Sequence, residues 1–342
     1  MFHIIFTGLF SGKTSIKKVI FDKIPPYEVE LDKQINHEYQ SHLYSFGYCQ
    51  LNIIEFPSSF SYEKNAKECE SFLMKCHVLI FIIDYNLSIN QQTEYFKNNI
   101  LPILNKYKLI NLYIFIHKID NYSKNSILQS QYNEEANKIQ SFIVKTYSQF
   151  AKTLNIEEFK KNFFITSIYD STLYEAFSTI LQNIIPQNQN FSFLIDLVFK
   201  NCNIDNTYLF DIKNRFCLAC SEKKKVNMFE ICLNMIDFAM DMCNIYDDDD
   251  KKKNDDDDDD NFDEDLDYSL EIKNFKNGLQ DSKSIVFFKY VFKNLALISI
   301  ISKERYERNN LIDYNINLLK QGIIRIFQKN EPSKNKIDLW DF

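Results

Sequence analysis

Glycine is scarce in this chain, because only five of its 342 residues are glycine and an average protein has about 7%. Two of the five, Gly8 and Gly12, fall in one short stretch near the N-terminus. A glycine missing from a motif elsewhere can reflect this bias in composition. The bias does not restore the backbone freedom that glycine would have provided.

Paired cysteines are also lacking. The eight cysteines are scattered, and only Cys217 and Cys220 stand close together. Because no second pair completes a zinc site, we interpret the cysteines as reduced, partly buried thiols of a cytosolic protein. Metal binding at Cys217 and Cys220 is the open alternative.

No apolar run is long and uninterrupted enough to indicate a membrane span. The richest stretch, IVFFKYVFKNLALISII, contains Lys289 and Lys293 and predicts two strands instead. The first residues, MFHIIF, lack a basic region before the apolar stretch. Residue 2 is Phe rather than Gly, and the tail KIDLWDF has no cysteine for prenylation. We therefore expect any membrane residence to come through partners.

The net charge of −7 comes from one segment, YDDDDKKKNDDDDDDNFDEDLDY. Without it the chain is roughly neutral to slightly basic, so we expect no nucleic-acid binding. Blocks of like charge cannot bury apolar area and are usually disordered. We predict a disordered Asp/Lys-rich insert at 247–265, a tolerated low-complexity insertion. An acidic tract that binds basic partners is the alternative.

The first half of the chain alternates predicted strands with helices. The alternation of strands and helices indicates a parallel α/β sheet whose ligands bind at the carboxyl ends of the strands. Pro25–Pro26 predicts irregular structure over 25–47. The length of the chain favours two domains. The expected strands are 2–8, 49–56, 77–84, 111–116 and 162–167, and the expected helices are 13–21, 90–106, 128–152 and 171–185.

The pattern changes after Pro186. Five short strands and three helices predict an α+β domain over 188–342, after a first domain over 1–187. The expected strands are 207–212, 215–220, 269–275, 284–291 and 295–302, and the expected helices are 189–201, 226–243 and 306–328.

The stretch FTGLFSGKTS resembles a phosphate-binding loop that is one residue short. The usual pattern has four residues between its glycines, G-x-x-x-x-G-K-[ST], but only three separate Gly8 from Gly12. Lys13 and Thr14 follow as the motif requires, with Thr14 placed to bind Mg²⁺. Taken alone, the short loop is a weak signal.

Further motifs follow at the ends of predicted strands. His117-Lys118-x-Asp120 resembles the N-K-x-D motif, in which the Asp carboxylate accepts two hydrogen bonds from guanine and the Lys stem lies over the base. TSIYD at 166–170 follows the next strand, where a Ser backbone N–H meets the guanine carbonyl. IIEFPSSF lies where a D-x-x-G motif belongs. Their order along the chain argues against a chance match and favours a guanine-nucleotide fold.

These stretches resemble the Rag GTPases, on the RagC/RagD side of that family, within the Ras-like small GTPase superfamily. The resemblance runs from about residue 2 to residue 328, apart from the Asp/Lys insert. Histidine in the base-reading motif is characteristic of the family. The matching segments are SGKTSIKKVIFDKIPP, EFP, IFIHKID, TSIYDSTLYEAFS and ERYERNNLIDYNI.

The resemblance implies a Ras-like P-loop GTPase domain over 1–187 and a roadblock (longin-like) domain over 188–342. That second domain would form a heterodimer with a RagA/RagB-like GTPase. The heterodimer would signal amino-acid sufficiency to the TOR kinase complex. The resemblance implies a cytoplasmic protein that a scaffold complex recruits to the lysosomal or vacuolar surface, with the nucleus as a second location.

The resemblance also implies guanine nucleotide (GTP or GDP) and Mg²⁺ as ligands. The metal would be held by Thr14 and Glu55, and no catalytic residue can be assigned. The nucleotide would be bound by Gly8, Ser11, Gly12, Lys13, Thr14, Ser15, His117, Lys118, Asp120, Ser167 and Ile168.

Departures from the family concentrate at the phosphate end. Besides the short loop, Glu55 replaces the usual Asp, Ser58 replaces the usual Gly, and Ser59 stands where many GTPases have Gln. Ile35 aligns with a metal-binding Thr. We therefore expect a GTPase by resemblance that binds guanine nucleotide, GDP in preference, and hydrolyses GTP slowly or not at all.

Two other functions stay open. A pseudo-GTPase would serve only as the structural half of the dimer, with no ligand. A P-loop kinase would need a lid with arginines, and the first 200 residues contain no Arg, which counts against it.

Overall fold

The computed structural model describes residues 1–31, 38–120, 126–149, 155–202, 204, 206–221, 228–247, 269–276, 283–302 and 309–330. The chain divides into two units, Met1–Ala176 and Phe177–Phe342. The division falls inside helix α8, somewhat before the predicted boundary at 187/188, which stays a prediction. Apart from its first residue, the predicted insert at 247–265 lies outside the described residues.

The first unit contains a six-stranded sheet in the order β2-β3-β1-β4-β5-β6. Every neighbouring pair is parallel except β2 and β3, which are antiparallel. The mostly parallel α/β sheet expected from the sequence is therefore confirmed. The strands are β1 (Phe2–Thr7), β2 (Gln40–Ser45), β3 (Gln50–Glu55), β4 (Val78–Asp84), β5 (Asn111–His117) and β6 (Phe163–Thr166).

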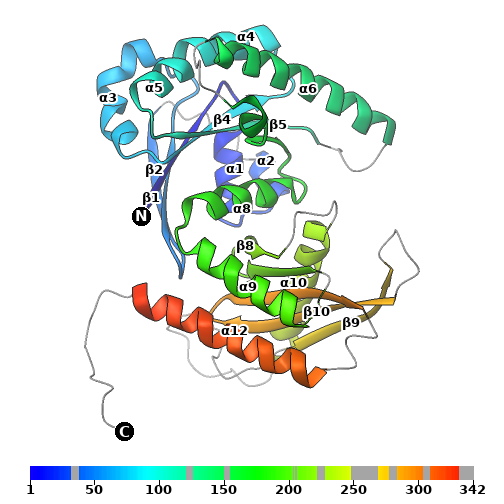
Figure 1. Cartoon of the computed structure of the whole chain (residues 1–342). Helices are drawn as coiled ribbons and strands as arrows, with labels where there is room; N and C mark the ends of the chain where they lie inside the picture. Colours follow the sequence, from blue (N-terminus) through cyan, green and yellow to red (C-terminus); the bar gives the residue numbers. More distant parts are fainter. Residues whose placement is uncertain are drawn as a thin grey trace. The chain divides into compact units, whose positions relative to one another are not determined.

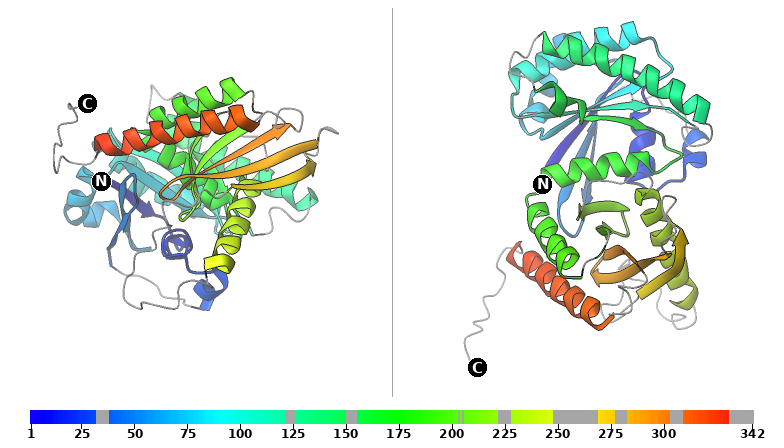
Figure 2. Two further views of the ribbon diagram at one scale, coloured as in Figure 1. Left: turned by 90° about the horizontal axis from the view of Figure 1, so that it is seen from below. Right: turned by 45° about the vertical axis from the view of Figure 1, so that its right-hand side comes forward.

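Helices cover both faces of this sheet. Helices α3, α4, α5 and α6 lie on one side, and α1 lies on the other (Figures 1 and 2). The helices are α1 (Lys13–Ile20), α2 (Pro26–Leu31), α3 (Tyr62–Met74), α4 (Ile89–Tyr95), the π-helical turn η1 (Phe96–Ile100), α5 (Leu101–Lys106), α6 (Ser126–Ser148), α7 (Ile156–Lys160) and α8 (Thr172–Ile184).

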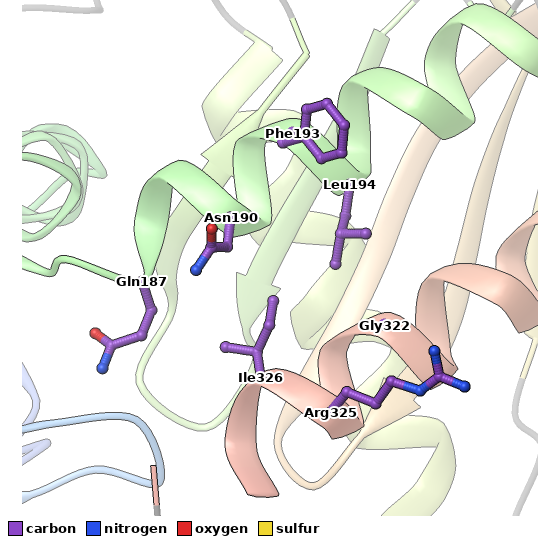
Figure 3. Close-up of a pocket in the computed structure, with 7 residues that line it drawn as sticks. All are labelled: Gln187, Asn190, Phe193, Leu194, Gly322, Arg325 and Ile326. Carbon is purple, nitrogen blue, oxygen red and sulfur yellow. The ribbon is translucent and has the colours of Figure 1, made fainter. Parts of the chain in front are cut away.

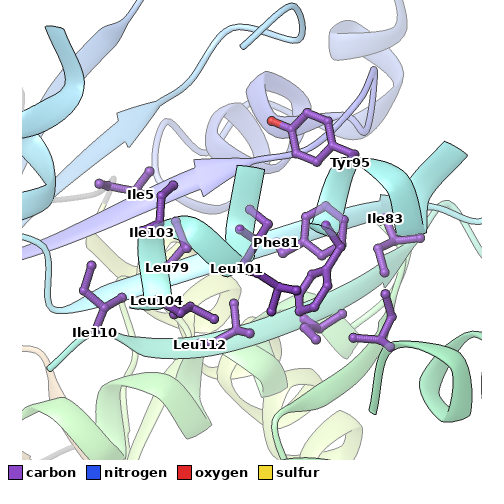
Figure 4. Packing of buried hydrophobic residues seen from close by; sticks show 14 of the residues in the cluster. Ile5, Leu79, Phe81, Ile83, Tyr95, Leu101, Ile103, Leu104, Ile110 and Leu112 are labelled. Carbon is purple, nitrogen blue, oxygen red and sulfur yellow. The ribbon is translucent and has the colours of Figure 1, made fainter. Parts of the chain in front are cut away.

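The central strand β4 shows why these residues form a parallel strand. All seven of its residues, VLIFIID, are buried, as expected for a strand covered on both faces. Leu79, Phe81 and Ile83 pack in the cluster shown in Figure 4 with residues of η1 and α5 such as Phe96 and Leu101. This rigid core holds the carboxyl ends of the strands in place.

The sequence-based expectation of irregular structure over 25–47 is wrong. Pro26 is the first residue of α2, a position where its fixed φ and missing N–H cost nothing. β2 alternates half-buried and exposed residues, because it is an edge strand paired only with β3. β2 therefore has no apolar run from which a strand could be predicted. Ile35 lies outside the described residues.

Helix α3 is also absent from the sequence-based expectation. It provides the crossover that a parallel connection from β3 to β4 requires, yet only Cys69 and Leu73 are fully buried along it. The expected helix at 90–106 exists as α4, η1 and α5 in direct succession.

The second unit contains a five-stranded sheet in the order β8-β7-β11-β10-β9. All of its strand pairs are antiparallel, and the stretch around Lys289 and Lys293 forms two strands, as predicted. Helices α9 and α12 lie on one face and α10 on the other (Figures 1 and 2). The elements are α9 (Asn188–Cys202), β7 (Asn206–Asp211), β8 (Phe216–Cys220), α10 (Met228–Asp247), β9 (Ser269–Lys276), β10 (Lys283–Phe292), β11 (Leu295–Ser302) and α12 (Asn309–Asn330).

A pocket of about 350 Å³ opens between α9 and α12 in the second unit (Figure 3). Gly322 lies where the two helices pass, and a Cβ there would be 3.0 Å from Leu194 Cδ1. The pocket is lined by Gln187, Asn190, Phe193, Leu194, Gly322, Arg325 and Ile326. Among the described residues, no helix is both long and apolar enough to cross a membrane.

Candidate functional site

The carboxyl ends of five strands bring the sequence motifs to one edge of the first sheet. β1 leads into Gly8, β3 ends at Glu55 and β5 ends at His117. The register pairs His117 with Asp84 at the end of β4 and with Thr166 at the end of β6. This is the edge at which open α/β sheets bind their ligands.

The phosphate loop depends on both of its glycines. Gly8 has φ +147°, and a Cβ there would lie 2.1 Å from the carbonyl oxygen of Ile82. Gly12 has φ +80°, and a Cβ there would lie 3.2 Å from His117 Cδ2. Between them Phe10, with φ +43°, takes a left-handed conformation that is uncommon for a non-glycine residue. The shortened loop therefore closes with a strained residue at Phe10.

The start of α1 fits a phosphate group. Gly12 is its N-cap residue, and no side chain of the described residues caps the helix there, so N–H groups of the first turn and the helix dipole can meet an anion. The Ser11 hydroxyl is fully buried and has no hydrogen-bond partner among the described residues. Ser15 continues the first turn of α1.

Lys13 places a buried ammonium group at this loop. Its Nζ donates to the Gly8 carbonyl at 2.6 Å and to Ser58 Oγ at 3.3 Å. Burial lowers the pKa of Lys13, the Glu55 carboxylate opposes this and the charge of Lys118 adds to it, and the resulting pKa is about 8. A buried ammonium without a close carboxylate is unfavourable unless an anion arrives, which favours a phosphate ligand here.

The residues predicted to read the base also come together. Ser167 Oγ donates to Asp120 Oδ1 at 2.6 Å, and Lys118 Nζ donates to Asp84 Oδ2 at 2.6 Å and to the Phe10 carbonyl at 3.0 Å. Lys118 therefore joins the predicted base-reading motif to the predicted phosphate loop.

One detail of the expected base contact differs. The Ser167 backbone N–H donates to Thr172 Oγ1 at 3.0 Å, rather than standing open toward a guanine carbonyl. This bond closes the loop onto the start of α8. Ile168 follows in the same loop and is half-buried.

Glu55, one of the two proposed metal ligands, fits a divalent cation poorly. Thr14 Oγ1 donates to Glu55 Oε2 at 2.7 Å, and Lys17 Nζ lies 3.4 Å from Glu55 Oε1. Oε1 makes an ion pair but no hydrogen bond of good geometry. Both oxygens of the one carboxylate thus face protein donors, whereas Mg²⁺ demands open, octahedral oxygen ligands. Among the described residues, no three His, Cys, Asp or Glu side chains are grouped to hold a metal ion.

Three residues of this site were missed by sequence reasoning: Asp84, Thr166 and Lys17. Asp84 ends the buried strand β4 and Thr166 ends β6, so their positions at strand ends could have indicated them. No sequence pattern indicates Lys17, because a buried lysine on a helix cannot be told from an exposed one in the sequence.

His117 gives the site a measurable dependence on pH. Its Nδ1 lies 3.0 Å from Thr166 Oγ1, and burial, together with the charge of Lys118, lowers the pKa of His117 from 6.5 to about 4. Between pH 6.5 and pH 4 the His117 side chain is protonated in the unfolded chain but neutral in the folded chain. The free energy of unfolding therefore falls as the pH falls through this range.

We expect this histidine to account for about 2 kcal/mol of stability lost between pH 7 and pH 5. The asparagine of His117→Asn does not titrate. The free energy of unfolding of this variant, measured with denaturant at pH 7 and pH 5, should therefore fall by about 2 kcal/mol less than that of the unchanged protein. All other titrating groups cancel in the difference between the two proteins. An equal loss in both proteins would contradict the assignment.

Comparison with known proteins identifies the family of this chain. Residues 4–236 match the model of the Gtr1/RagA G protein conserved region. Over 93% of its length the chain is 27% identical to mouse Ras-related GTP-binding protein D, 26% to human Ras-related GTP-binding protein C and 29% to GTP-binding protein gtr2 of Schizosaccharomyces pombe. The matches span 66%, 74% and 95% of those proteins, respectively. The chain therefore belongs to the Gtr1/RagA family of G proteins, as a Rag GTPase of the RagC/RagD type.

Proposed function

We propose that this chain is the guanine-nucleotide-binding, RagC/D-like subunit of a heterodimer with a RagA/RagB-like GTPase. One observation carries the nucleotide part: Lys118 links the base-reading motif to the phosphate loop through its bond to the Phe10 carbonyl at 3.0 Å. The relatives are named as GTP-binding proteins, which supports the same ligand.

Each end of the site has a defined task in this proposal. The Asp120 carboxylate accepts hydrogen bonds from the guanine N–H and amino groups, a donor pair that adenine lacks. Ser167 Oγ holds that carboxylate in place at 2.6 Å. Lys13, the Ser11 hydroxyl and the first N–H groups of α1 receive the phosphates.

We further propose that GTP hydrolysis is slow or lost. Ser59, at the position of the water-orienting Gln, is exposed and too short for that task. Ser58 Oγ lies 3.3 Å from Lys13 Nζ, in the place where glycine would leave room for a γ-phosphate. With one loop residue fewer, a lost backbone donor could cost about 1–3 kcal/mol, which weakens binding without abolishing it. The same features favour GDP over GTP.

Ser58→Gly should raise the affinity for GTP relative to GDP by about fivefold, because it removes a hydroxyl that competes for Lys13, a hydrogen bond worth about 1 kcal/mol. Competition of GTP and GDP against a fluorescent GDP measures the ratio. Ser59→Gly, at the exposed neighbouring position, is the matched control and should leave the ratio unchanged. An unchanged ratio in Ser58→Gly would contradict the proposed role of Ser58.

The second unit is proposed to be the roadblock (longin-like) dimerisation domain. Its antiparallel sheet, with α9 and α12 on one face and α10 on the other, supports this assignment. We propose that the heterodimer relays amino-acid sufficiency to the TOR kinase complex and is held at the lysosomal or vacuolar surface by a scaffold complex.

Co-purification with the RagA-like protein of the same cell tests the proposal. The full chain should form a stable pair, and mild extraction should release guanine nucleotide from both subunits. Lys13→Ala should abolish nucleotide on this subunit. If the Lys13→Ala heterodimer signals and binds partners unchanged, the chain is a pseudo-GTPase that acts as a structural subunit. Rapid single-turnover GTP cleavage at this subunit would contradict slow hydrolysis.

A further inference from the structure

Lys17 is a buried lysine that the proposed function leaves without a task. It follows Lys13 by four residues on α1, hence on the same face of the helix, and it is only 5% exposed. Its Nζ lies 3.4 Å from Glu55 Oε1, 3.1 Å from His42 Nε2 and 3.9 Å from Asp22 Oδ2. Of the two carboxylates, Glu55 is the buried one, at 2% exposed.

The position of Glu55 is the one from which P-loop GTPases hold a divalent cation, together with the Ser or Thr of the phosphate loop. Here the two corresponding residues bind one another, since Thr14 Oγ1 donates to Glu55 Oε2 at 2.7 Å. The remaining oxygen faces the Lys17 ammonium. A positive charge of the protein thus already lies where the metal charge would be needed.

Lys17 cannot easily leave this position. Moving it away would leave Glu55 as a buried carboxylate with only one donor, which is strongly unfavourable. A divalent cation that bound Glu55 with Lys17 in place would lie close to an ammonium group where little water screens the repulsion. Either route makes metal binding at Glu55 costly.

We propose that Lys17, through its ion pair with Glu55, takes over the charge-neutralising role of the divalent cation, so that this chain binds guanine nucleotide with little dependence on Mg²⁺. The inference rests on the proposed nucleotide-binding function.

The first experiment needs no variant. The dissociation constant of fluorescent GDP is measured on the purified full chain in millimolar MgCl₂ and in excess EDTA. We expect the two constants to agree within about fivefold. A larger gain in affinity with Mg²⁺ overturns the inference. Binding in neither buffer overturns the proposed function itself, so the two failures are distinguishable.

Three variants then assign the effect to Lys17. Lys17→Gln should bind GDP more weakly in EDTA and regain affinity with Mg²⁺. Its dissociation constant for GDP in EDTA should be at least about tenfold larger than that in MgCl₂. Lys17→Arg keeps the charge and should behave like the unchanged protein. Lys18→Gln removes the same charge one position on, about 100° around the helix, and should also leave the ratio unchanged.

A Lys17→Gln protein that stays indifferent to Mg²⁺ overturns the role of Lys17, whereas acquired dependence supports it. If thermal melting shows that Lys17→Gln does not fold, the inference is tested on the unchanged protein and Lys17→Arg. Their dissociation constants for GDP in EDTA and in MgCl₂ should agree within about fivefold, and a larger difference overturns the inference. Direct titration with Mn²⁺, followed by its paramagnetic signal, should show tighter binding to the GDP complex of Lys17→Gln than to that of the unchanged protein.

Discussion

Asp120→Asn should lower the affinity of the chain for GDP by at least about a hundredfold and give it affinity for xanthosine diphosphate. Two hydrogen bonds to a charged carboxylate contribute about 1.5–3 kcal/mol each, and an amide loses the charge and turns one acceptor into a donor. Xanthine carries a carbonyl oxygen where guanine carries its amino group, so the Asn amide can donate to it.

The variant should remain folded. Its amide oxygen can still accept the bond from Ser167 Oγ, which spans 2.6 Å to Asp120 Oδ1. Equilibrium binding of fluorescent GDP and competition by xanthosine diphosphate measure the effect. Asp170→Asn is the matched control in the neighbouring loop, where the carboxylate accepts from the Thr172 backbone N–H at 2.9 Å. Equal GDP affinity in Asp120→Asn and the unchanged protein would show that Asp120 does not read the base.

The features that sequence reasoning predicts best have signals confined to a few neighbouring residues. VLIFIID is apolar almost throughout because both faces of β4 are covered, so it indicates a buried parallel strand without knowledge of its neighbours. The motif from His117 to Asp120 directly follows such a run, which places it at the carboxyl edge of the sheet. The same reasoning found the loop from Gly8 to Gly12.

Elements with weak local signals escape this reasoning. β2 exposes alternate side chains as an edge strand, and α3 fully buries only Cys69 and Leu73, so neither shows a strong apolar pattern. Their presence follows from the sheet as a whole, since a parallel pair needs a crossover.

Contacts between residues far apart in the sequence cannot be predicted from local patterns for another reason. The pair of Lys118 with Asp84 and the pair of Lys17 with Glu55 join residues 34 and 38 positions apart. Only the fold brings them within reach. The functional consequence is largest at Glu55, which the sequence presents as a displaced metal ligand and the structure as the partner of a lysine.

Gly8→Ala should destabilise the first unit by about 2–6 kcal/mol and abolish nucleotide binding. A Cβ at Gly8 would lie 2.1 Å from the Ile82 carbonyl oxygen and 2.6 Å from Ser11 Oγ. The first of these atoms belongs to the backbone of β4, the central strand, and cannot move aside. Overpacking typically costs about 1–3 kcal/mol, and an unfavourable φ adds about 1–3 kcal/mol.

Two other glycines, Gly12 and Gly47, supply graded controls for this prediction. Gly47→Ala meets no atom within 4 Å and has no unusual φ, so it should change stability by less than about 1 kcal/mol. Gly12→Ala should fall between the two, because its Cβ would meet a movable side chain, His117, at 3.2 Å. Hydrogen exchange of β1 and β4 in the full chain reports the free energy of opening for this unit. If Gly8→Ala protected these strands as well as Gly47→Ala does, the loop would not be pinned against β4. Neither contact with the sheet nor the positive φ of Gly8 would then explain why a chain so poor in glycine keeps one at this position.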